Sequence, residues 1–181
     1  MSRAVVLYGP PASGKDTVTA ELVKLDGRFV PYRRLKVGAG RPQGYRIVAA
    51  EQFNSLQAAG DILYRNDRYG NVYGIDRPSL DTLIGAGCVP VVHIGQIDGL
   101  MAIEAYPAQW LRVLLWCDRQ TTDQRSAARG DGDTATRLTV WDETKHDLDA
   151  HPSVVFHLRI RTDHVTVAEA ARAIQIAEQS L

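Results

Sequence analysis

Short apolar runs alternate with segments of helical periodicity along most of the chain. The runs predict buried strands over residues 4–8, 89–94, 111–116 and 154–160. After the first run, Val18, Leu22 and Leu25 follow the spacing of one helical face. Further helices are expected over residues 50–59, 80–85, 98–105, 121–129, 134–146 and from 166 onward. Strands that alternate with helices predict an α/β fold, in which helices cover both faces of a parallel sheet.

One part of the chain breaks this rhythm. Residues 27–48 interleave arginines with tyrosines, glycines and prolines, and are too polar to form core. Residues 62–64 have the pattern of a short strand, and residues 69–74 contain a tight turn. We therefore expect a single domain over residues 1–181, with a core of residues 1–28 and 76–181 and a small inserted lobe over about residues 29–75.

The protein carries no formal net charge at neutral pH. Twenty-one basic side chains balance twenty-one acidic ones, so no nucleic acid or membrane is expected as a partner. Cys88 and Cys117 form no ligand cluster and are expected to be free thiols in a reducing compartment. No signal-peptide pattern and no apolar run of membrane-spanning length is present, so we expect a cytoplasmic protein.

The candidate chemistry begins directly after the first strand, in the stretch GPPASGKDT of residues 9–17. A strand, a glycine-rich turn and a helix together are typical of a loop whose backbone N–H groups bind phosphates. Lys15 is then placed to neutralise the outer phosphates of a nucleoside triphosphate. The other residues expected to hold that nucleotide are Gly9, Ala12, Ser13, Gly14, Asp16 and Thr17. The alternative is a glycine-rich turn that opens a helix and binds nothing.

Position 16 departs from the usual pattern G-x-x-x-x-G-K-[ST], whose last hydroxyl ligates Mg²⁺. Here the residue is Asp16, and Thr17 follows it. A carboxylate suits Mg²⁺, which favours oxygen ligands, and without a metal it would repel a triphosphate. Asp16 is therefore the candidate metal ligand.

Further motifs follow in order: YRIV at 45–48, GNVYG at 70–74 and RSAARG at 125–130. With the phosphate loop, this order resembles the guanylate kinase family of nucleoside monophosphate kinases over most of the chain. The resemblance implies a P-loop NTPase three-layer fold with a parallel core sheet, an acceptor-binding lobe and an arginine-bearing lid over about residues 119–137. It also implies ATP and Mg²⁺ as cofactors, and a small phosphate-bearing acceptor as the partner.

The resemblance also implies which residues hold the acceptor's phosphate. The family uses two arginines three positions apart, a tyrosine nine residues on, and the tyrosine of its Gly-Asn-x-Tyr-Gly motif. The matching positions are Arg33, Lys36, Tyr45 and Tyr73. Lysine keeps the charge but lacks the bidentate fork of arginine. The alternative is that these are solvated loop residues.

The positions that read guanine in the family are changed. Its glutamate corresponds to Tyr64 and its serine or threonine to Ile75, and neither offers a carboxylate to the base. The Asp-x-Asp that ends the family's second core strand becomes His93 and Gly95. We therefore expect Tyr64 and Ile75 to contact an acceptor other than ordinary GMP.

One branch of the family shares some of these departures. The ribose 1,5-bisphosphate phosphokinases of phosphonate metabolism carry Gly-Lys-Asp-[Ser/Thr] in the phosphate loop and apolar residues where guanine is read. Residues 14–17 and Ile75 are similar to that pattern. A kinase for another phosphorylated sugar or nucleotide fits equally well, with Asp67 or Asp76 as a substitute for the missing glutamate.

The arginines of the lid region are expected to serve the transfer, because phosphoryl transfer needs positive charge on the migrating group. We assign Arg125 and Arg137 to the transferring phosphate and Arg129 to the nucleotide. For each of them a surface salt bridge is the alternative. His93 lies on an apolar strand and is interpreted as a core histidine without a catalytic role.

Three functions follow from these observations. The first is an ATP-dependent kinase for a small phosphate-bearing acceptor that is similar to a nucleoside monophosphate but is not ordinary GMP, acting as a monomer or homodimer, with a ribose 1,5-bisphosphate phosphokinase as the alternative. The second is a non-catalytic guanylate-kinase-like binding module, against which the intact Gly-Lys pair and the lid arginines argue. The third is a regulatory nucleoside triphosphatase, which the acceptor-gripping segment disfavours.

Overall fold

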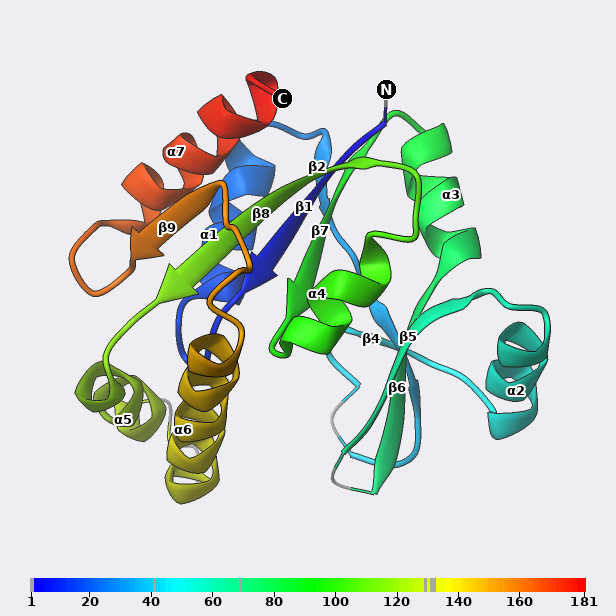
Figure 1. Cartoon of the computed structure of the whole chain (residues 1–181), viewed down its shortest axis with the longest axis horizontal. Coiled ribbons are helices and arrows are strands. Elements are labelled where there is room, and N and C mark those ends of the chain that lie inside the picture. Colours follow the sequence, from blue (N-terminus) through cyan, green and yellow to red (C-terminus); the bar gives the residue numbers. More distant parts are fainter. Residues whose placement is uncertain (1, 41, 69, 129, 131–132) are drawn as a thin grey trace.

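The computed structural model describes residues 2–40, 42–68, 70–128, 130 and 133–181. Its core is a parallel sheet of five strands, which confirms the predicted α/β class (Figure 1). The strand order is β2 (Phe29–Pro31), β7 (Val89–Ile94), β1 (Arg3–Tyr8), β8 (Gln109–Trp116) and β9 (Leu158–Arg161). The lobe had been expected to begin at about residue 29, but β2 pairs with β7 in the core sheet.

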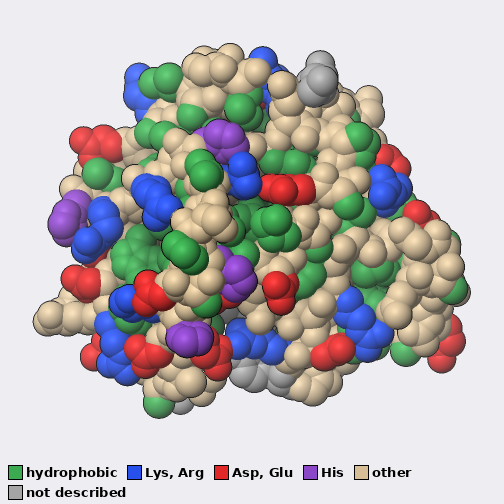
Figure 2. Space-filling view, in the orientation of Figure 1, with side chains coloured by type: hydrophobic (Ala, Val, Ile, Leu, Met, Phe, Trp, Pro, Cys, Tyr) green, Lys and Arg blue, Asp and Glu red, His purple; other side chains and the backbone are tan. Residues whose placement is uncertain are grey.

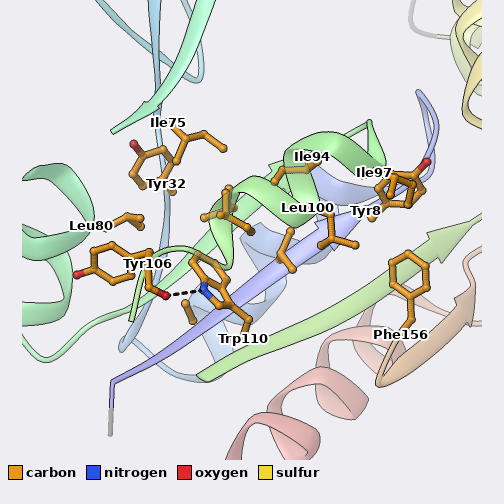
Figure 3. Packing of buried hydrophobic residues seen from close by; sticks show 14 of the residues in the cluster. Tyr8, Tyr32, Ile75, Leu80, Ile94, Ile97, Leu100, Tyr106, Trp110 and Phe156 are labelled. Carbon is orange, nitrogen blue, oxygen red and sulfur yellow. Dashed lines mark hydrogen bonds between the residues drawn. The ribbon is translucent and has the colours of Figure 1, made fainter. Parts of the chain in front are cut away.

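Helices cover both faces of the sheet, because successive side chains of a strand point to opposite sides. On one face lie α1 (Lys15–Leu25) and α7 (Val167–Gln179), and on the other α3 (Arg77–Gly85) and α4 (Ile97–Ile103). The buried apolar residues form one cluster on each face of the sheet. Val5 and Leu7 of β1 belong to the first cluster, beneath α1 and α7, whereas Val6 and Tyr8 belong to the second, beneath α3 and α4. Figure 3 shows the second cluster, which extends from the α3 side to Phe156.

The inserted lobe has a sheet of its own, at the lower right of Figure 1. Its order is β4 (Tyr45–Ile47), β3 (Arg34–Val37), β6 (Asn71–Asp76) and β5 (Ile62–Arg68). β3 pairs in parallel with β4, and the other two pairings are antiparallel. The helix α2 (Ala50–Ala58) buries Phe53, whose ring lies so close to Gly74 that a Cβ there would come within 2.6 Å of it.

Two further helices, α5 (Arg119–Ala128) and α6 (Thr134–Ala150), lie at the lower left of Figure 1, beyond the carboxyl end of β8. The C-terminal half of α6 is fixed to the core through Asp147. This carboxylate accepts hydrogen bonds from Tyr8 Oη at 3.1 Å and from the Ile97 backbone N–H at 2.7 Å. Burial and the nearby Asp147 charge raise the pKa of the Tyr8 phenol above its ordinary value.

The last core strand is shorter than the apolar run 154–160 predicted. It begins at Leu158, and the preceding residues approach the core as a loop. That loop places the Phe156 ring 5.6 Å from the Tyr8 ring, so the apolar side chains are buried without strand pairing. Among the described residues, no helix combines the length and hydropathy needed to span a membrane.

Candidate active site

The phosphate loop, the lobe and α6 surround a cleft of about 410 Å³ at the carboxyl end of β7. In α/β sheets ligands bind at this edge. Figure 2 shows Lys and Arg side chains in the region between α6 and the lobe. The cleft is cationic, because four basic side chains line it against a single described carboxylate, that of Asp133. The four are Lys15, Arg34, Arg68 and Arg137.

The phosphate loop lies between β1 and α1, and its glycines occupy positions that a side chain would obstruct or strain. A Cβ on Gly9 would lie 2.1 Å from the Leu115 carbonyl oxygen, so no side chain fits where the loop leaves β1. Gly14 is left-handed, with φ 89°, and directly precedes α1. Ala12 is also left-handed, with φ 57°, which is uncommon for a residue with a side chain. The loop therefore holds a strained, defined shape.

Lys15 lies folded back on this loop. Its ammonium donates to the carbonyl oxygens of Gly9 and Pro10, both at 2.7 Å, and to Ser13 Oγ at 3.3 Å. Burial lowers the pKa of Lys15 from 10.5 to about 8, although the Asp16 carboxylate acts in the opposite direction. A bound polyphosphate would stabilise the charged form by the same electrostatics that Asp16 supplies.

In the lobe, the structure places Arg34 in the cleft instead of Arg33. Arg34 and Lys36 alternate onto the face that carries Tyr45 and Tyr73, whereas Arg33 precedes β3 and is exposed. The Arg34 guanidinium carbon lies 5.7 Å and 5.6 Å from the centres of the two tyrosine rings. Arg33, which the family spacing selected, does not line the cleft, because it lies before β3 with its side chain exposed.

Lys36, Tyr45 and Tyr73 do come together, as the sequence predicted. The tyrosine ring centres are 5.3 Å apart. Lys36 is buried beside them, with its ammonium 5.6 Å from the Tyr45 ring centre and 6.0 Å from that of Tyr73. Both tyrosines line the cleft together with Arg34. This end of the cleft therefore gathers cations and hydroxyl groups, which suits a phosphate.

The two positions aligned with the guanine-reading residues have different surroundings. Tyr64 lines the cleft and donates through its hydroxyl to Gln96 Oε1 at 2.5 Å. Burial raises the pKa of Tyr64, and the positive charge of Arg34 opposes that shift. Ile75 has no exposed surface and packs in the core with Leu80. The expected contact between Ile75 and an acceptor is therefore wrong, because the apolar side chain is enclosed beneath the cleft.

Neither aspartate suggested as a substitute reaches the cleft lining. The Asp76 carboxylate accepts from Tyr32 Oη at 2.7 Å and from the Ser79 backbone N–H at 3.1 Å, which caps α3. It also pairs with Arg46. Asp67 is exposed and pairs with Arg65 at 3.1 Å. Neither of these two aspartates therefore replaces the missing glutamate in the cleft lining.

The lid arginines separate. Arg137 lines the cleft, on the wall formed by α6. Arg125 points to the other side of the phosphate loop, where its guanidinium donates to Ala12 O at 2.9 Å and Thr162 O at 2.7 Å. Its donors are bound to backbone carbonyls, so its assignment to the transferring phosphate is not supported by this geometry. Arg129 lies outside the described residues.

Arg125 borders a second cavity, of about 370 Å³, on the far side of the phosphate loop. Thr17 lies here and not in the cleft, together with Gly14, Thr162 and Thr166. The two cavities therefore flank the loop. The second cavity is thus open to the loop on the side away from the cleft.

His93 is a site residue that the sequence interpretation missed. Its ring lies at the carboxyl end of β7, lines the cleft, and is 24% exposed. Nδ1 is 3.5 Å from Asp16 Oδ1, and Nε2 is 2.7 Å from Thr19 Oγ1. The signal that could have revealed it was its place at a strand end next to the phosphate loop, the edge where ligands bind.

The donor set fits a magnesium nucleotide. Asp16 is 91% exposed at the first turn of α1, next to the lysine that would meet the phosphates. Among the described residues, no cluster of three His, Cys, Asp or Glu side chains forms a metal cage. One carboxylate with the remaining ligands from phosphate and water is the usual way in which proteins bind Mg²⁺.

Comparisons with known proteins agree with this architecture. The chain is 30% identical over 156 residues to a ribose 1,5-bisphosphate phosphokinase PhnN from Rhodopseudomonas palustris, covering 84% of this chain and 78% of that protein. It is 29% identical over 131 residues to a guanylate kinase from Symbiobacterium thermophilum, covering 70% of this chain and 62% of that one. No family model matches the sequence.

The fold has a solved counterpart. The crystal structure of guanylate kinase from Anaplasma phagocytophilum matches with a TM-score of 0.69 and 18% identity, over 99% of this chain and 85% of that one. The relatives found by sequence are kinases. The phosphate loop, the cationic cleft and the extent of these matches lead to one conclusion: the chain belongs to the guanylate kinase-like family.

Proposed function

We propose that the protein is an ATP-dependent kinase that transfers the γ-phosphoryl group to a small acceptor already bearing a phosphate, and that this acceptor is not ordinary GMP. The observation that carries the proposal is the distribution of charge in the cleft. Lys15 and the phosphate loop line the cleft from the core, and Arg34 with Tyr45 and Tyr73 lines it from the lobe. Two anionic groups can therefore be held facing each other.

The roles follow from the positions. The loop and Lys15 bind the donor phosphates, while Arg34, Tyr45 and Tyr73 hold the acceptor's phosphate, with Lys36 buried beside them. Arg137 on α6 lines the same cleft, and its role is to neutralise charge on the migrating group. Arg125 braces the loop and borders the cavity for the donor nucleoside. Bound near Asp16, Mg²⁺ would neutralise charge on the donor phosphates.

A sugar bisphosphate is the acceptor class with the most support. Position 64 offers a tyrosine hydroxyl instead of a carboxylate, and position 75 is enclosed in the core. Arg68 adds a cation to the lining, and it pairs with Glu143 of α6. A second phosphate suits such a site better than a purine edge that needs a carboxylate. The similarity to a ribose 1,5-bisphosphate phosphokinase supports the same substrate.

A coupled assay of ADP release tests the proposal. Purified protein with ATP and Mg²⁺ is offered ribose 1,5-bisphosphate, ribose 5-phosphate, and each common nucleoside monophosphate. We expect the highest kcat/KM with ribose 1,5-bisphosphate, and a value for GMP at least about a hundredfold lower, the penalty for leaving a polar edge unpaired. A preference for GMP would contradict the proposed acceptor. ATP binding without turnover on any phosphate-bearing compound would favour the binding-module alternative.

A further inference from the structure

Two positions at which the sequence departs from the family pattern meet in the structure. Asp16 stands where the phosphate loop usually has a hydroxyl, and His93 stands where the second core strand usually ends in an aspartate. They are 77 residues apart in sequence, yet His93 Nδ1 lies 3.5 Å from Asp16 Oδ1. The two unusual residues therefore contact each other in the folded protein.

The other side of the imidazole is held by α1. Thr19 Oγ1 lies 2.7 Å from His93 Nε2, and the Thr19 side chain is buried. Asp16 and Thr19 are three residues apart, so they lie on the same face of α1. The helix thus presents a hydroxyl and a carboxylate to the two nitrogens of one ring.

The hydrogen bond to Thr19 defines which ring nitrogen faces the carboxylate. When the Thr19 hydroxyl donates to Nε2, the ring proton resides on Nδ1 and faces the carboxylate of Asp16.

We propose that His93 is a positioning residue that, anchored by Thr19, orients the Asp16 carboxylate toward the divalent ion accompanying the donor nucleotide. The inference rests on the proposed function, since it needs a nucleotide on the loop. Without a partner, an aspartate that is 91% exposed samples several rotamers, and each lost rotamer opposes metal binding. Residues that orient a metal ligand typically change metal affinity by about 10- to 100-fold when removed.

The test measures binding, not turnover. Isothermal titration gives the affinity of the protein for ADP with EDTA and with Mg²⁺, and electron paramagnetic resonance counts Mn²⁺ bound to the ADP complex. For His93→Leu we expect the metal-dependent gain in ADP affinity to fall by about 10- to 100-fold, with metal-free ADP binding unchanged. His93→Asn places an amide near the position of Nδ1 and should recover most of that gain.

Replacing Asp16 by serine supplies the matched background. In Asp16→Ser, which restores the usual hydroxyl, a further His93→Leu change should alter the metal-dependent gain by no more than about twofold, since nothing remains to be oriented. Equal weakening of ADP binding with and without metal would overturn the inference and make His93 a support of the loop. Unchanged metal binding in His93→Leu would overturn it as well. Failure of the unmodified protein to bind ADP under either condition would instead remove the proposed function.

Discussion

The two ends of the cleft are built in different ways. At the phosphate loop, the hydrogen bonds of the Lys15 ammonium go to residues within the loop, and most are to the backbone. At the acceptor end, Arg34, Tyr45 and Tyr73 come from three strands and meet only because β3, β4 and β6 pair in one register. The first site is local in sequence, whereas the second depends on a sheet.

This difference decides how each end tolerates change. A side chain in the loop can be exchanged without moving the backbone, because close approach at Gly9 and the turn at Gly14 define the loop's shape. In the lobe, the register of the strands determines the direction of each side chain, so neighbouring residues on one strand point to opposite faces of the sheet. Substitution of a loop side chain such as Lys15 should therefore impair catalysis without a loss of stability, and substitutions in the lobe should affect either binding or stability according to their face.

The largest effect is expected from Lys15→Met. Transfer should fall by at least about a hundredfold, because the variant loses the charge that meets the developing phosphate charge. The free energy of unfolding should stay the same or rise, since burial lowers the pKa of Lys15 from 10.5 to about 8 and the charged form is disfavoured in the empty fold. Turnover at the normal rate would contradict the loop assignment.

The pH dependence of stability sharpens this test. Below pH 8 the folded protein carries the penalty of the half-buried ammonium, and between pH 8 and 10.5 it releases that proton before the unfolded chain does. Any stability advantage of Lys15→Met should therefore be greatest below pH 8 and shrink as the pH rises toward 10.5. Chemical denaturation at a series of pH values measures the difference between the two proteins.

A smaller effect is expected from Arg34→Ala, with Arg33→Ala as its matched control. Loss of the Arg34 guanidinium should raise the acceptor's KM by about 10- to 100-fold, the equivalent of losing a charged hydrogen bond, and leave the KM for ATP unchanged. Arg33 is exposed outside the cleft lining, so its replacement should change neither value by more than about twofold. A larger effect at Arg33 would instead support its assignment to the acceptor's phosphate.

The sequence allowed the phosphate loop and the alternating α/β core to be predicted because both depend on short-range patterns. Arg34 was missed because spacing from Tyr45 does not show which face a strand residue takes. Arg125 was assigned to a phosphate because its charge is visible in the sequence, while the carbonyl of Ala12 that it binds is not. His93 was interpreted as a core residue because its neighbours on β7 are apolar. The sequence does not show that the strand ends beside Asp16.

The smallest effect is expected from a comparison of Ile75→Val with Tyr64→Phe, a change at the neighbouring residue that lines the cleft. Ile75→Val removes one methylene from a side chain with no exposed surface, so the free energy of unfolding should fall by about 0.5–1.5 kcal/mol, and the acceptor's KM should not change. Tyr64→Phe removes the hydroxyl that binds Gln96 in the cleft, so it should alter the acceptor's KM. Denaturation and steady-state kinetics on both variants measure this contrast. A change of more than about threefold in KM for Ile75→Val, at unchanged stability, would mean that the acceptor reaches this side chain and that the lobe opens further than its packing indicates.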